Sequence, residues 1–299
     1  MKYIIYSILL FAACHLIYAG EYDKEVNAFR KALVETKGGQ TNYNAESINR
    51  LKQILNFYEE LNQPMVNKEM VLKKYLKYED IEQLVRGEYA DFLMRENKYN
   101  EALREYEAYL NEAIKNGNSM MLHWEQYRKA GLCCHFLKRD KKAFEYFATS
   151  ISNALKWAEY IFPRLPVEKR ESLLNDISIL FLDLAWACLG TKEYVYSINL
   201  VNNFIETNKD DSRGYSCRAL AKWGLNDLDG AIKDFRIAGE LGDASAFKSI
   251  GICEELKRSP TSTQINITDV YYRYLSTYHL MEISNELSIM NTNLLLLSR

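Results

Sequence analysis

Residues 218–238 carry a regular spacing of small and aromatic side chains. They read Arg-Ala-Leu-Ala-Lys-Trp-Gly-Leu-Asn-Asp-Leu-Asp-Gly-Ala-Ile-Lys-Asp-Phe-Arg-Ile-Ala. Ala219 and Ala231 lie twelve residues apart, and Phe235 and Ala238 follow Ala231 by four and seven positions. Two antiparallel helices can approach closely only where small side chains face each other and an aromatic ring fills the adjacent gap. The spacing therefore predicts a tightly packed helical hairpin.

The same twelve-residue pair recurs three times upstream. The pairs are Ala90/Ala102, Gly131/Ala143 and Ala185/Ser197. Two of these copies also have an aromatic residue four positions after the second member, whereas the third has Val201 there. The steps between copies are 41, 54 and 34 residues, so the array is irregular. A second helix in the 54-residue step is expected to extend to Pro163 and end there. A weaker fifth first helix is expected to begin at Ala244.

This pattern resembles the tetratricopeptide repeat (TPR), whose period of 34 residues equals the last step. The resemblance covers about residues 80–256, a little over half of the chain. It implies an all-α fold, a right-handed superhelical array of antiparallel helix hairpins that forms a TPR-like solenoid with helical caps. The resemblance also implies a non-catalytic protein that binds a protein or peptide partner and needs no cofactor.

The composition agrees with a helical, soluble protein. The 38 Lys and Arg nearly balance the 40 Asp and Glu, which gives a formal net charge of −2 and no electrostatic reason to expect nucleic acid. Only 4 Pro and 13 Gly occur in 299 residues, and scarce breakers favour long helices.

Motifs for catalysis or metal binding are missing from the sequence. It contains no Gly-rich phosphate loop and no GxSxG motif. The run Cys133-Cys134-His135 is suggestive of metal or thiol chemistry, but adjacent residues on a helix point about 100° apart and do not converge on one ion. The sequence therefore predicts no enzyme activity and no metal site.

The first twenty residues are typical of a secretory signal peptide. Lys2 precedes a nearly uncharged stretch, and small residues stand at Ala19 and Gly20. We expect cleavage and a periplasmic or secreted mature protein. Lipid attachment at Cys14 is the alternative, although the apolar run continues past it. Membrane association is expected only if this segment is retained or lipidated, because we expect no later window to be long and apolar enough to span a bilayer.

The remaining five cysteines do not predict a disulfide framework. Their number is odd and none has CxxC spacing, so we interpret them as small apolar core residues, with one disulfide left open.

The flanks of the repeats also have helical patterns. Residues 21–79 predict a helical cap or a degenerate repeat, which would cover the apolar end face of a stack. The repeats occupy residues 80–257, and residues 258–299 contain a polar loop followed by a long helix from about Asp269 to Met290. One face of that last helix is apolar and rich in tyrosine, including Tyr271 and Tyr274.

The resemblance implies a partner-binding groove, because the first helices of TPR repeats line a concave surface that holds an extended peptide or a helix. Mapped onto this chain, the groove residues are Met94, Arg128, Leu132, His135, Phe136, Leu182, Trp186, Leu220 and Trp223, and the same pattern includes Asp91, Arg95, Leu189 and Ser216. The family's clamp for the C-terminal carboxylate of chaperones uses Lys, Arg and Asn on these faces, so such a clamp is not expected here.

Two interpretations of the groove stay open. Trp186 and Trp223 point about 100° and 40° away from the small-residue face of their helices. Large aromatic side chains in such places either anchor a partner or are covered by another part of the chain. The first interpretation predicts an interaction scaffold. The second predicts a structural or accessory subunit of a cell-envelope or secretion complex, with the groove filled by the chain's own C-terminal helix.

Overall fold

The computed structural model describes residues 53–54, 56–63, 65–79, 81–117, 120–258, 267–268 and 270–274. These residues divide into two compact units, one ending at Ile81 and the other starting at Glu82. The predicted signal peptide, the first predicted helix and most of the long C-terminal helix lie outside the described residues.

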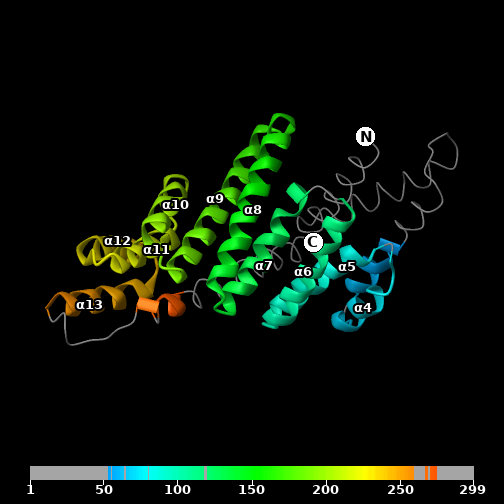
Figure 1. Cartoon of the computed structure of the whole chain (residues 1–299), viewed down its shortest axis with the longest axis horizontal. Coiled ribbons are helices and arrows are strands. Elements are labelled where there is room, and N and C mark those ends of the chain that lie inside the picture. The colour runs from blue at the N-terminus through cyan, green and yellow to red at the C-terminus, as the bar shows by residue number, and fades with distance from the viewer. Residues whose placement is uncertain are drawn as a thin grey trace, which may run out of the picture. The chain divides into compact units, whose positions relative to one another are not determined.

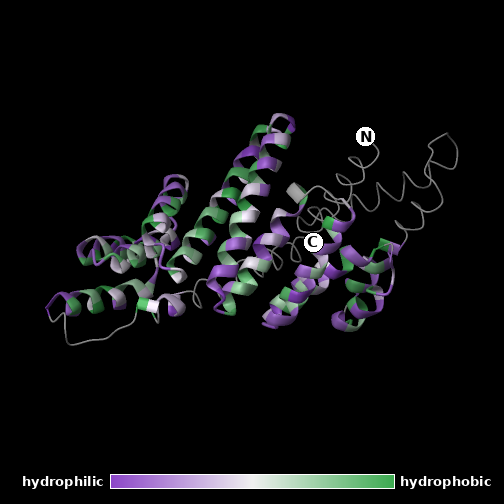
Figure 2. Cartoon of the chain, in the orientation of Figure 1, coloured by the Kyte–Doolittle hydropathy of each residue, from purple (hydrophilic) through white to green (hydrophobic). Residues whose placement is uncertain are grey.

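The described residues are helical and include no strand, which confirms the predicted all-α repeat array (Figure 1). The helices are α4 (Lys68–Tyr75), α5 (Glu82–Arg95), α6 (Tyr99–Lys115), α7 (Trp124–Phe136), α8 (Asp140–Ile161), α9 (Val167–Gly190), α10 (Tyr194–Thr207), α11 (Ser212–Gly224), α12 (Leu228–Glu240) and α13 (Ala244–Arg258), with 3-10 turns η1 (Met120–His123) and η2 (Phe162–Arg164). Figure 2 shows both polar and apolar residues along the helices from α5 to α13, as expected where only one side is covered.

The first unit has a small aromatic core of its own. The rings of Phe57 and Tyr75 meet edge to face with centroids 5.2 Å apart, and both residues are buried. Asn67 caps α4 by accepting a hydrogen bond from the backbone N–H of Met70 at 3.1 Å.

Four hairpins in the second unit share one turn. The residues with left-handed backbone, at φ between 57° and 64°, are Asn97, Lys138, Lys192 and Asn226. Each stands five positions before the second member of a small-residue pair. The next N–H in each turn donates to a carbonyl five residues earlier at 2.8–2.9 Å. This is the Schellman arrangement that ends a helix, so the same turn closes all four hairpins.

The small residues are buried where the two helices of each hairpin pack together. The Ser197 hydroxyl donates to the backbone carbonyl of Ala185 at 2.9 Å, which places one predicted pair in direct contact. Ala90, Ala102, Ala219 and Ala231 are fully buried. Each helix from α5 to α13 packs on the next, and α9 also packs on α7 and α11. The first helices of neighbouring hairpins therefore lie side by side.

The close approach at Gly131 predicts a loss of stability in Gly131→Ala. A methyl group there would lie 2.7 Å from two atoms of the Phe147 ring, which is fully buried. Overpacking costs about 1–3 kcal/mol, and alanine regains up to about 1 kcal/mol of helix propensity. We expect the free energy of unfolding to fall by about 1–2 kcal/mol in urea titrations followed by circular dichroism.

Gly251→Ala is the matched control for this substitution. Gly251 lies inside α13, and no atom lies within 4 Å of a methyl group added there. Alanine should raise stability there by about 0.5–1 kcal/mol. Equal gains at both glycines would contradict the tight contact between α7 and α8.

The irregular step in the array comes from two long helices. As predicted, α8 continues to Ile161 and ends before Pro163, which lies in η2. Helix α9 has 24 residues, and Figure 1 shows the pair extending beyond its neighbours. The expectation that no later segment is long and apolar enough to span a membrane was wrong. Residues 170–190 meet both criteria, but 67% of that window is buried inside the protein because α9 packs between α8 and α10.

The five cysteines after Cys14 are free and buried, which agrees with their interpretation as core residues. Burial raises the pKa of the Cys134 thiol to about 11 and that of Cys188 to about 12. Because thiols with such pKa values stay protonated near neutral pH, they are poor nucleophiles and poor metal ligands.

Candidate functional site

A short helical segment near the C-terminus lies on the repeats. Val270 to Tyr274 are helical, and Tyr271 and Tyr274 are buried. The Trp186 ring of α9 stacks with both tyrosines, at centroid distances of 6.1 and 6.5 Å. The Phe235 ring of α12 stacks on Tyr274 at 5.9 Å. Aromatic contacts therefore join this segment to two repeats.

The tyrosine hydroxyl groups also have partners on the repeats. The hydroxyl of Tyr271 is hydrogen-bonded to Nε2 of the buried His135 and donates to Oδ1 of Asp140 at 3.3 Å. The hydroxyl of Tyr274 is hydrogen-bonded to the Ser249 hydroxyl of α13 at 3.0 Å. We call His135, Asp140, Trp186, Phe235 and Ser249 together the docking surface.

Asp140 takes a place that an apolar side chain has in the other hairpins. The residue three positions before the second small residue is Tyr99, Asp140, Tyr194 or Leu228 in the four copies. Tyr99 stacks on Phe136 of the next first helix with centroids 4.1 Å apart. Tyr194 also packs closely on Gly224 of the next first helix, because a methyl group added to Gly224 would lie 2.5 Å from the Tyr194 ring.

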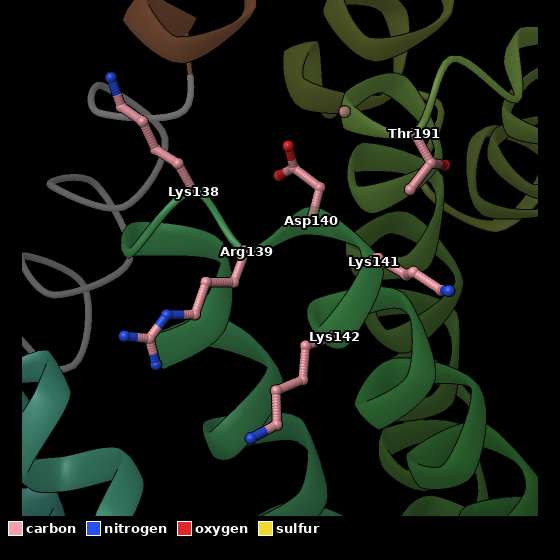
Figure 3. A pocket seen from close by; sticks show the side chains of 7 residues that line it. Lys138, Arg139, Asp140, Lys141, Lys142 and Thr191 are labelled. Atoms are coloured by element: carbon pink, nitrogen blue, oxygen red, sulfur yellow. The ribbon is translucent and has the colours of Figure 1, made fainter.

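In the corresponding interface the carboxylate of Asp140 lies directly on Gly190. A small polar group thus replaces an aromatic ring. A shallow depression of about 570 Å³, open to solvent, lies beside this interface and is lined by Lys138, Arg139, Asp140, Lys141, Lys142, Gly190 and Thr191 (Figure 3).

Tyr272 reaches the same carboxylate from the C-terminal segment. Its hydroxyl donates to Oδ2 of Asp140 at 2.7 Å, and Nζ of Lys138 lies 4.5 Å from its ring centroid. One carboxylate therefore holds two successive tyrosines, which fixes both the position and the rotation of the segment.

Burial governs the protonation of these groups. It raises the pKa of Asp140, although the hydrogen bonds from Tyr272 and Tyr271 act in the opposite direction. Burial also raises the pKa of Tyr271 well above its ordinary value, and the charge of Asp140 adds to this effect. The Tyr271 hydroxyl therefore keeps its proton and acts as the donor to Asp140.

The structure distributes the predicted groove residues over several environments. His135 and Trp186 contact Tyr271, and Trp223 meets Phe235 edge to face. Leu132, Leu182 and Leu220 are buried. Phe136 stacks on Tyr99, and Met94 is half-buried. Only part of the predicted set is thus brought together at the docking surface.

Ion pairs outside the docking surface join the first helices of neighbouring hairpins. Nε of Arg128 on α7 lies 2.6 Å from Oδ2 of the buried Asp183 on α9. Nζ of Lys129 lies 2.7 Å from Oδ2 of Asp91 on α5. Arg128, predicted as a groove residue, is therefore engaged by its neighbouring repeat.

Sequence reasoning named Tyr271 and Tyr274 but missed Asp140, Gly190 and Ser249. A signal for Asp140 exists, because aligning the four copies shows one charged residue where the other three have Tyr or Leu. Gly190 and Ser249 have no comparable signal, since both residue types are common in packed helices.

The described residues contain no group of three or more His, Cys, Asp or Glu placed to hold a metal ion. His135 faces Tyr271, whereas Cys133 and Cys134 are buried within the repeat packing. What this site offers chemically is aromatic stacking and hydrogen bonding to hydroxyl groups.

No family model matches this chain, and no curated protein matches it. Among solved structures, MamA is 16% identical over 69% of this chain and 99% of its own, with a TM-score of 0.44. YrrB, described as a TPR protein with an unusual peptide-binding site, is 15% identical over 72% of this chain and 97% of its own, with a TM-score of 0.44. Part of a TPR repeat-containing protein from Cytophaga hutchinsonii is 17% identical over 88% and 92%, with a TM-score of 0.43.

Proposed function

Since the chain folds as a tetratricopeptide-type array of helical hairpins, we propose that it is a non-catalytic protein-interaction scaffold that binds a helical segment of a polypeptide. The observation that carries the proposal is the seating of Val270–Tyr274 on the docking surface. A helix-in-groove mode of this kind uses an amphipathic helix with anchors three or four residues apart. Tyr271 and Tyr274 have that spacing.

In this proposal the chain's own segment occupies the surface at rest, and a partner helix competes for it. The contacts of Trp186 with both tyrosines favour this arrangement over a permanently vacant groove. The same contacts would also suit a structural subunit of an envelope complex, in which the segment never leaves. Displacement of the segment is what separates the two roles.

The proposal includes export to the periplasm or the cell exterior. It rests on the N-terminal sequence, where Lys2 precedes an apolar run that ends at Ala19-Gly20. N-terminal sequencing of the protein recovered from its native host would test it, with Gly20 or Glu21 as the expected first residue.

The scaffold role is tested with a labelled peptide of residues 265–280, which contains the seated segment. The full chain carrying Tyr271→Ala and Tyr274→Ala should bind this peptide about 10- to 100-fold more tightly than the unaltered chain in fluorescence anisotropy. The reason is that a tethered segment competes at an effective concentration in the millimolar range.

The control adds Trp186→Phe to the doubly substituted chain. This substitution keeps an aromatic residue in the core but changes the surface on which the tyrosine rings stack. Binding should weaken several-fold there, while circular dichroism stays unchanged. We call the chain with Tyr271→Ala and Tyr274→Ala the opened chain. If the opened chain is folded and binds no peptide, the docking surface is not a peptide-binding site and the scaffold role assigned to it fails.

A further inference from the structure

We propose that the docking surface selects tyrosine over phenylalanine at the first anchor, so that a partner must present a helix with Tyr at one position and an aromatic residue three positions later. This inference rests on the proposed function and names the chemical class of its ligand. The juxtaposition behind it is His135 and Asp140 on either side of one buried tyrosine hydroxyl.

The hydroxyl of Tyr271 is held by a complementary pair of groups. Asp140 accepts its proton, with the two oxygens 3.3 Å apart. With that proton committed, the hydroxyl oxygen can only accept, so the arrangement requires the His135 tautomer that carries its proton on Nε2. His135 is almost fully buried, and its Nε2 lies 3.9 Å from Asp140. The site therefore offers one donor and one acceptor to a single hydroxyl group.

Phenylalanine at this position could not hydrogen-bond to either group, although Asp140 would keep its hydrogen bond from the Tyr272 hydroxyl. The ring could still stack on Trp186, but the buried Nε2 of His135 would lose the hydroxyl that it meets here. A site built to bind a hydroxyl discriminates strongly against the analogue that lacks it, because its own polar groups are left unpaired.

Asp140 stands where the neighbouring hairpins have a tyrosine. Tyr99 and Tyr194 fill the equivalent interfaces with their rings, whereas here the Asp140 carboxylate packs directly on Gly190. Cationic side chains line the nearby depression (Figure 3). One of them, Lys138, lies over the Tyr272 ring. The interface is thus shaped for tyrosine side chains supplied from outside the repeat.

The docking surface discriminates less strongly between tyrosine and phenylalanine at the second anchor, Tyr274. Among the described residues the Tyr274 hydroxyl is hydrogen-bonded to the Ser249 hydroxyl, a neutral pair at 3.0 Å. Replacing Tyr274 by Phe removes one bond between neutral groups, which is worth less than a bond to a charged group.

The experiment compares three peptides of residues 265–280 on the full chain opened by Tyr271→Ala and Tyr274→Ala. The peptide with Phe at position 271 should bind at least tenfold more weakly than the unaltered peptide. The peptide with Phe at position 274 should bind about two- to fivefold more weakly. Isothermal titration calorimetry at pH 7.5 gives all three dissociation constants.

Equal affinity of the 271 and 274 variants would overturn tyrosine selection while leaving peptide binding intact. Failure of all three peptides to bind would instead reject the proposed function. Should the opened chain prove unstable, amide exchange in the intact chain gives the same decision. Tyr271→Phe should speed exchange of residues 270–274 at least tenfold relative to Tyr274→Phe, and equal rates in the two variants would overturn the proposal.

Discussion

Replacing Trp186 by Ala lowers the free energy of unfolding by about 3–5 kcal/mol in our expectation. The indole is 2% exposed in the middle of the array and stacks with both tyrosines of the C-terminal segment. Its removal leaves a cavity in the core and takes away the surface on which those rings rest. Urea unfolding followed by far-ultraviolet circular dichroism measures the loss.

The matched control is Leu174→Ala on the same helix, where the side chain is 51% exposed. It should lose less than about 1 kcal/mol. A double-mutant cycle of Trp186→Ala with Tyr271→Ala then isolates the contact between the two rings. Additivity within about 0.5 kcal/mol would contradict the seating of the segment on α9.

The second large effect is expected from Asp234→Asn, at about 2–4 kcal/mol. Asp234 is 3% exposed and accepts from Nε and Nη2 of Arg218 at 2.9 and 2.8 Å. Its Oδ2 also lies 2.7 Å from Nζ of Lys222. Removing the negative charge leaves two cations on α11 without their counter-ion, and breaking a buried pair costs up to about 5 kcal/mol. The partly exposed partners reduce this figure, because water takes over part of their solvation.

Asp229→Asn on the same helix separates burial from charge. Asp229 also pairs with a lysine, Lys257, but its side chain is 74% exposed. The midpoint of urea unfolding should stay unchanged there. Equal effects of the two substitutions would show that Asp234 is not a buried ion-pair centre.

Much of the fold could be predicted because close helix packing restricts residue size at fixed positions. The pair Ala185/Ser197 was predicted from its spacing alone, and the structure joins it by a hydrogen bond. Pro163 marked the end of α8 because proline lacks the N–H that a helix interior needs. Such constraints act locally and are therefore visible in a single sequence.

The docking surface could be predicted only in part, because it depends on contacts between distant residues. His135 and Trp186 were assigned to a groove through the resemblance to the repeat family, but Asp140 accepts its hydrogen bonds from residues more than 130 positions away. Nothing local indicates that a carboxylate at the start of α8 accepts two tyrosine hydroxyls. Likewise α9 is apolar because it packs against helices on both sides. The sequence alone does not distinguish such a buried helix from one that spans a membrane.

The seated tyrosines also bear on how the array comes apart. In a simple stack, each repeat is stabilised only by its neighbours, and the terminal units fray independently of the middle. Val270–Tyr274 contacts α7, α8 and α9 as well as α12 and α13. This bridge closes the linear chain of neighbour contacts into a loop. Melting of the last hairpin is thereby coupled to the central ones, and the unit gains the all-or-none character of a compact globule.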